Sequence, residues 1–164
     1  MPLSASELRD HLAYSAWASQ RLVHAACQLT EAELLRDFQT SERSVLGTLV
    51  HTFAGDRVWL ARLQGSPRQG FSSDADRHLS VLQKEWPDVY RQWDELAAGW
   101  TDDAVAADFT YQDLRGNTWT NPVWHLAMHV VNHGTHHRGQ VAGFLRSMGH
   151  TPPALDLVAF HRQK

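Results

Sequence analysis

Apolar residues recur every three to four positions along four long stretches of this chain, which is the spacing of one face of an α-helix. These stretches cover about residues 5–28, 45–64, 78–98 and 121–149. Little of the remaining sequence alternates as a β-strand would. The pattern therefore predicts an all-α fold, with the four long helices packed as an antiparallel four-helix bundle in a single domain over residues 1–164.

Residues at the ends of these stretches support the first two helices. Ser4 and Glu7 have the spacing of a capping box, in which the serine and glutamate side chains bond each other's backbone N–H groups. Ser44 is a suitable N-cap for the second helix, and Gly65 follows its last apolar residue. We expect both helices to begin at these serines.

Prolines mark the third and fourth helices. Pro87 lies inside the third apolar pattern, so it must kink that helix or begin a new one as its first residue. Asn121 and Pro122 predict the start of the fourth helix, as N-cap and first helical residue. The segment 108–120 reads as a short hairpin or irregular loop around a turn at 115–117, and residues 31–35 as a short helical turn.

Composition excludes several classes of protein. The net charge is −3 and the basic residues are scattered, so the basic stripe of a nucleic-acid-binding protein is absent. No apolar run approaches the length that crosses a membrane, and residues 1–10 lack the apolar core of a signal peptide. With Cys27 as the single cysteine, no internal disulfide can form. We therefore expect a cytoplasmic protein that binds neither nucleic acid nor membrane.

Candidate chemistry is concentrated in the fourth helix, which carries five of the eleven histidines. They are His125, His129, His133, His136 and His137. On a helical wheel His137 falls within the apolar arc and His133 lies about 20° outside it, whereas the other three lie further out. Imidazoles four residues apart share one helix face and can bind one metal ion. This pair therefore predicts metal binding. The same sequence pattern would also arise from two histidines at the edge of the core that only form hydrogen bonds with their neighbours.

A complete site needs a further ligand, because catalytic zinc takes three protein ligands and keeps a fourth position open. The candidate is His51, which shares a face of the second helix with the small residues Gly47, Ala54 and Gly55. Small neighbours let another helix approach, but an exposed histidine would show the same pattern. Asp56 could support the site from outside, although we expect a solvated or salt-bridged aspartate.

The spacing of His133 and His137 matches the H-E-x-x-H pattern of zinc proteases, but the residue after His133 is Gly134. The general base of that chemistry is missing, which excludes a protease of this kind. His136 is expected on the solvent side. The other histidines outside the fourth helix lack a partner at metal-binding spacing.

Three segments resemble a known family. Residues 14–19 (Y-S-A-W-A-S), 44–51 (S-V-L-G-T-L-V-H) and 132–140 (N-H-G-T-H-H-R-G-Q) are similar to the motifs of the DinB-like metal-dependent enzymes, a superfamily that includes bacillithiol-type thiol S-transferases. The family pattern Y-N-x-W-x-N and N-H-x-x-H-H-R-G-Q is followed closely. The departures are serines at positions 15 and 19, where the family has asparagine.

The resemblance implies a four-helix bundle, often a homodimer, with a divalent metal held by His51, His133 and His137. The metal of such sites is usually zinc or nickel. No other cofactor is implied, and the catalytic residues stay unassigned.

Two reactions are compatible with such a site. A small thiol could bind as thiolate and attack an electrophilic substrate, which requires no protein base. Alternatively, bound hydroxide could hydrolyse a substrate, for which the sequence offers only Asp56, His129 or His136 as acid or base. A metal-binding stress-response protein without turnover is a third possibility. We expect thiol transfer to a small-molecule substrate, because no convincing base is present.

Overall fold

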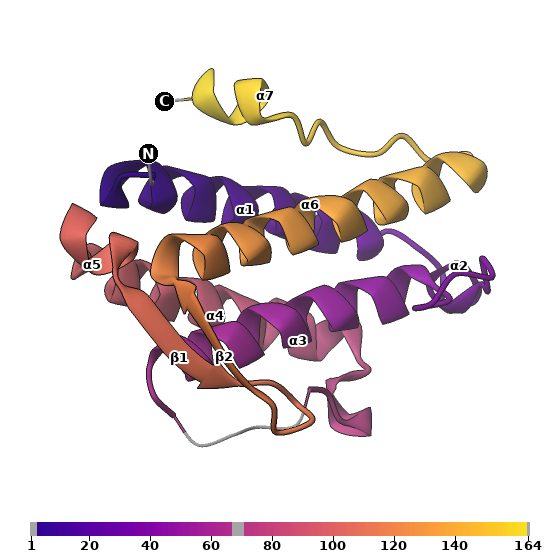
Figure 1. The fold of residues 1–164 in the computed structure, drawn as a ribbon. Helices are drawn as coiled ribbons and strands as arrows, with labels where there is room; N and C mark the ends of the chain where they lie inside the picture. Colours follow the sequence, from indigo (N-terminus) through magenta and orange to yellow (C-terminus); the bar gives the residue numbers. More distant parts are fainter. Residues whose placement is uncertain (1–2, 67–70, 164) are drawn as a thin grey trace.

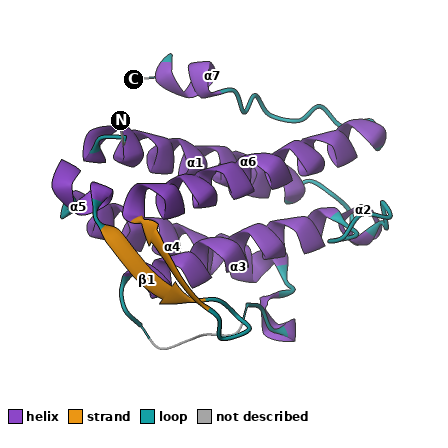
Figure 2. Ribbon diagram, in the orientation of Figure 1, coloured by secondary structure: helices purple, strands orange, loops and turns teal. Residues whose placement is uncertain are grey.

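A computed structural model describes residues 3–66 and 71–163, and most of them are helical (Figures 1 and 2). The long helices are α1 (Ala5–Ala26), α3 (Val45–Leu63), α4 (Leu79–Ala98) and α6 (Val123–Ser147). Shorter elements lie between them and after α6: α2 (Glu31–Leu35), the 3₁₀ helix η1 (Asp74–Asp76), α5 (Asp102–Ala106), the strands β1 (Asp108–Gln112) and β2 (Thr118–Pro122), and α7 (Leu157–His161).

The four long helices pack around one apolar core and form an all-α bundle with a small hairpin at its side (Figure 1). α6 contacts both α1 and α3, and α4 contacts the same two helices from the other side. Each long helix supplies fully buried side chains to the core, such as Leu22, Phe53, Trp86 and Leu145. Within the described residues, no helix is long and apolar enough to cross a membrane.

The predicted caps of the first two long helices are confirmed. The Ser4 hydroxyl accepts a bond from the Glu7 N–H, and the Glu7 carboxylate accepts from the Ser4 N–H at 2.8 Å. The Ser44 hydroxyl accepts from the N–H of Gly47 at 3.0 Å. Gly65 follows α3 with a φ of +68°, a left-handed conformation that glycine adopts without steric cost. Both helices therefore begin where the sequence indicated.

The start of α6 differs from the prediction. Asn121 and Pro122 form the end of β2, paired with Phe109 and Asp108, and α6 begins one residue later at Val123. Pro122 is the residue before the helix rather than its first residue. The pairing of β1 with β2 holds these residues extended, and this tertiary contact outweighs the local preference of Asn-Pro for a helix start.

Pro87 does not begin a new helix, because α4 runs through it from Leu79 to Ala98. A proline inside a helix removes the bond to the carbonyl four residues earlier, which here belongs to Gln83. Both Pro87 and Gln83 are exposed, so water can bond that carbonyl. The expected hairpin and the short helical turn at 31–35 are both present, as β1–β2 and α2.

Candidate metal centre

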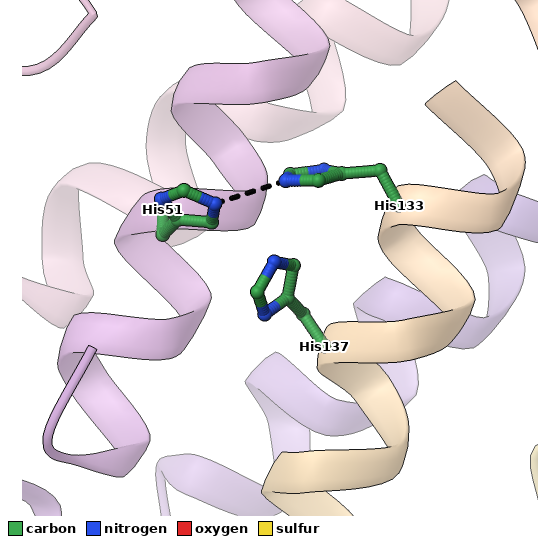
Figure 3. Close-up of side chains that lie close together, drawn as sticks. All are labelled: His51, His133 and His137. Carbon is green, nitrogen blue, oxygen red and sulfur yellow. Dashed lines mark hydrogen bonds between the residues drawn. The ribbon is translucent and has the colours of Figure 1, made fainter. Parts of the chain in front are cut away.

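His51 from α3 and His133 and His137 from α6 point toward one another (Figure 3). The Nε2 atoms of His51 and His133 are 2.9 Å apart, and one nitrogen from each of the three rings lies within 4.8 Å of the others. A tetrahedral ion with metal–nitrogen bonds of about 2.0–2.1 Å places its ligand nitrogens roughly 3.3 Å apart. The observed separations bracket that value, so this donor set fits a divalent metal.

A glycine on α3 allows the two helices to come this close. A Cβ atom on Gly55 would lie 2.8 Å from Cε1 of His133, closer than side-chain atoms normally approach. His51 lies four residues earlier, on the same face of α3. Gly55 therefore serves the predicted purpose, since it admits the imidazole of another helix, whereas a Cβ on Gly47 would meet the backbone carbonyl of Glu42 instead.

Partners on the outer side of two rings fix their orientation. Nδ1 of His137 is 2.8 Å from Oε1 of Gln140, and Nδ1 of His51 is 3.4 Å from Oε1 of Glu42. The Gln140 oxygen accepts from Nδ1 of His137, so this nitrogen carries the hydrogen and Nε2 keeps its lone pair, whereas the Glu42 carboxylate lies beside Nδ1 of His51. Such outer partners are typical of histidines that bind metals. Sequence reasoning did not find Glu42 or Gln140 in this role, although Gln140 belongs to the conspicuous 132–140 segment.

The surroundings favour the neutral form of His51 and His133. Burial lowers the pKa of His133 to about 3, together with the positive charge that His137 and His51 would carry if protonated. Burial also lowers the pKa of His51, with Glu42 acting in the opposite direction. Neutral rings have lone pairs available for a cation, so no proton has to leave His133 at pH 7.

The trio is open to solvent on one side. His137 is buried, whereas His51 and His133 are partly exposed. Within residues 3–66 and 71–163 no fourth histidine, cysteine or carboxylate joins the group. A small molecule could therefore reach the point on which the nitrogens converge.

The other histidines of α6 lie outside the trio. His136 is exposed, as predicted, and its ring centroid is 4.9 Å from that of His137. His129 is also exposed and lies one turn before His133, with ring centroids 6.0 Å apart. His125 contacts Trp124 at the start of the helix. Of the five, the structure thus brings together the two that the wheel selected.

Asp56 corrects the sequence interpretation, because it is buried rather than solvated. Its side chain is 2% exposed, and its Oδ2 accepts a bond of 2.8 Å from the indole N–H of Trp86. Trp93 donates to its backbone carbonyl at 3.1 Å. Burial raises the pKa of Asp56 to about 7, although the Trp86 bond and the charge of Arg138 act against this. Asp56 faces α4 and the bundle interior.

Arg138 forms a second buried group that the sequence analysis missed. Its guanidinium donates to the hydroxyls of Ser15 at 2.9 Å and Ser19 at 3.2 Å, and to that of Thr135 at 2.9 Å. A Cβ on Gly134 would lie 2.6 Å from this guanidinium, so the glycine makes room for it. Ser15 and Ser19 are the two positions at which this sequence departs from the family pattern. The presence of serine at both asparagine positions was the sequence signal that could have pointed to this buried group.

Comparison with known proteins identifies the family of this chain. The family model described as the DinB family matches residues 1–164. Among curated proteins, Protein DinB of Bacillus subtilis (strain 168) is 22% identical over 149 residues, which cover 87% of this chain and 87% of that protein. The whole-length family match carries the assignment, and the chain belongs to the DinB family.

Proposed function

We propose that this protein is a divalent-metal-dependent enzyme that transfers a small thiol to an electrophilic substrate. His51, His133 and His137 are the ligands, and zinc or nickel is the metal. We also propose that the four long helices form an antiparallel four-helix bundle and that two copies of the chain associate as a homodimer. One observation carries it: three imidazoles converge, and no fourth ligand joins them within the described residues.

The protein residues determine what such a site can do. A divalent ion held there would act as a Lewis acid and lower the pKa of a thiol or of water at its open position. Three neutral imidazoles leave the positive charge uncompensated, which favours an anionic fourth ligand. Gln140 holds the outer nitrogen of His137, so this ring keeps its lone pair directed inward, and the Glu42 carboxylate lies 3.4 Å from the outer nitrogen of His51.

The carboxylates near the trio favour thiol transfer over hydrolysis. Glu42 is directed at the outer nitrogen of His51, and Asp56 is enclosed beside Trp86. Neither is placed as a base for water at the centre of the trio. A thiol needs less help, because its ordinary pKa is close to neutral and a metal lowers it further.

Hydrolysis is the second candidate, and His129 is the observation in its favour. Its exposed ring stacks near His133, and partial burial together with the positive charge of Arg62 lowers its pKa. A neutral imidazole there could take a proton from water.

Metal analysis and a substrate panel test the proposal. Untagged protein should contain about one zinc or nickel per chain, and the His136→Ala variant should retain it, because that ring points outside the trio. The loaded protein should then be incubated with several small thiols and an electrophilic acceptor, and separately with esters and amides. Metal-dependent consumption of thiol supports thiol transfer. Metal-dependent cleavage of esters or amides, without consumption of thiol, would show that the protein is a hydrolase instead. Bound metal with no turnover of either kind would indicate a binding protein.

A further inference from the structure

A cavity of about 610 Å³ lies between the second half of α1 and the segment that follows α6. This segment leads from the end of α6 to α7 (Figure 1), and the Tyr14 hydroxyl of α1 donates to its Leu155 carbonyl at 2.9 Å. The volume is that of a small-molecule site. No member of the histidine trio lines the cavity, and Leu145, which does, lies about 12 Å along α6 from His137.

The lining combines an apolar wall with one permanent positive charge. Leu29, Leu145 and Pro153 contribute to the apolar wall, beside the ring of Trp17. Arg21 is the one arginine or lysine among the described lining residues, and none of them is an aspartate or glutamate. A cavity of this composition favours a ligand that has an anionic group and an apolar body.

Arg21 is held in place by an aromatic ring and lacks an acidic partner. Its guanidinium carbon lies 5.0 Å from the ring centroid of Trp17. Its Nε is enclosed without a hydrogen bond, and within residues 3–66 and 71–163 no carboxylate forms an ion pair with this side chain. The side chain as a whole is partly exposed, and its terminal nitrogens are not among the enclosed atoms. These planar donors match the two oxygens of a carboxylate.

Contacts from the C-terminal part of the chain fix the ring on which Arg21 packs. The ring centroid of Phe160 in α7 lies 5.6 Å from that of Trp17. The indole N–H of Trp17 donates to Oε1 of Gln163 at 3.1 Å. Because Trp17 is held in this way, the guanidinium loses less conformational freedom when a ligand binds.

The carboxylate that contacts the cavity lining is already engaged by other groups. Oε1 of Glu33 lies 2.8 Å from Nε2 of His150, a lining residue. Oε2 of Glu33 accepts from the N–H and the hydroxyl of Thr30, at 2.9 and 2.8 Å. The His150 bond and the two Thr30 bonds lower the pKa of Glu33 to about 2. Glu33 therefore pairs with His150 and Thr30 and leaves the charge of Arg21 uncompensated.

We propose that this cavity binds a small organic acid. Arg21 binds the carboxylate, and the apolar body of the acid packs against Leu29, Leu145 and Pro153. The site is separate from the histidine trio, so it depends neither on metal binding nor on thiol transfer.

Three probe molecules test the proposal by calorimetry on the full chain. 4-Phenylbutyrate has both the carboxylate and an apolar body, 4-phenylbutyramide has the same shape without the charge, and acetate has the charge without the body. We expect phenylbutyrate to bind roughly tenfold more tightly than the amide, the order expected for one charge-assisted bond. Acetate should also bind at least about tenfold more weakly than phenylbutyrate, because it buries little apolar surface.

Three variants isolate the charge of Arg21. Arg21→Gln should bind acid and amide equally and leave the amide affinity within about twofold, whereas Arg21→Lys should retain part of the preference for the acid. Arg146→Gln is the matched control, because it removes an exposed arginine next to Leu145 that does not line the cavity. This variant should bind like the parent protein. Circular dichroism checks that the helices of each variant are intact.

Methyl NMR locates the bound acid. Leu29 and Leu145 line the cavity, so their methyl resonances should move during titration with phenylbutyrate. The methyl resonances of Leu60 on α3, which does not line it, should stay in place. Shifts at Leu60 without shifts at Leu29 and Leu145 would place the acid elsewhere and overturn the proposal.

The affinities give the remaining outcomes. Equal binding of acid and amide by the parent protein, or binding of neither, would overturn the proposal. It would also be wrong if the preference for the acid survived in a folded Arg21→Gln protein, or fell as far in Arg146→Gln, which would indicate a general effect of net charge. If Arg21→Gln does not fold, Arg21→Lys takes its place, and an unchanged or absent preference in that variant contradicts the proposal.

Discussion

Two polar groups of this protein are built from the same pair of helices, yet they differ in access to solvent. On one side, His51 of α3 meets His133 and His137 of α6, with two of the rings partly exposed. On the other side, Asp56 of α3 and Arg138 of α6 are both less than 5% exposed. The first group is partly open to solvent, whereas the second is enclosed and bonded to tryptophan and serine side chains.

This difference shows how one helix pair can carry two kinds of polar chemistry. The enclosed groups obtain hydrogen bonds from the protein, although Asp56 Oδ1 and Arg138 Nε have no partner among the described residues. The open trio instead directs several lone pairs at one point, an arrangement that a cation can satisfy. The enclosed group should therefore affect folding, and the open trio should affect ligand binding.

The largest expected effect is loss of metal from the open group. His133→Ala or His137→Ala should abolish stoichiometric metal binding, and His51→Ala should weaken it by orders of magnitude because three-point chelation is lost. Metal titration of each purified variant, with His136→Ala as the control, measures this. Unchanged affinity in His51→Ala would show that His51 is not a ligand.

Removal of the buried positive charge of Arg138 should mainly lower the stability of the fold. Arg138→Met removes the donor to Ser15, Ser19 and Thr135, and it also removes a positive charge that acts on Asp56. We expect the free energy of unfolding of the metal-free protein to fall by about 3 kcal/mol. Urea denaturation measures it, and Arg91→Met on the surface of α4 is the control. If Arg138→Met is as stable as the parent protein, the enclosed group does not have the role in folding that distinguishes it from the open trio.

The enclosed group should also respond to pH. The folded protein holds the Asp56 pKa at about 7, above the ordinary value of 3.8, so folding favours the protonated form. Its contribution to stability is fully present below about pH 4 and is lost as pH rises toward 7. Asp56→Asn cannot ionise, so its stability relative to the parent should improve by about 4 kcal/mol between pH 4 and 8. Urea denaturation of both proteins across this pH range measures the difference in their free energies of unfolding. A difference that stays the same at every pH would contradict the prediction.

The smallest effect is expected at the outer partner of His137. Gln140→Ala removes the oxygen that accepts from Nδ1 of His137, so the ring becomes free to turn. Metal affinity should fall roughly tenfold with little change in the stability of the metal-free protein. Competition against a chelator measures the affinity. A loss as large as that of His133→Ala would mean that Gln140 contributes more than orientation.

Much of the fold and of the candidate site was accessible from the sequence. Apolar spacing located the four long helices, and the wheel selected His133 and His137 from five histidines. The start of α6 was missed because pairing of β1 with β2 holds Asn121 and Pro122 in a strand. The character of Asp56 was missed because helix periodicity cannot tell that Trp86 supplies a partner from α4.

The sequence by itself determined which residues form helices and which faces of those helices are apolar, because both follow from interactions between residues a few positions apart. Only the tertiary structure decided that Gly55 admits His133, that Ser15 and Ser19 bind Arg138, and that Arg21 lines a cavity. The first two contacts join residues distant in the sequence, and the cavity beside Arg21 has walls from separate parts of the chain. Such features depend on how helices pack, which local periodicity does not specify.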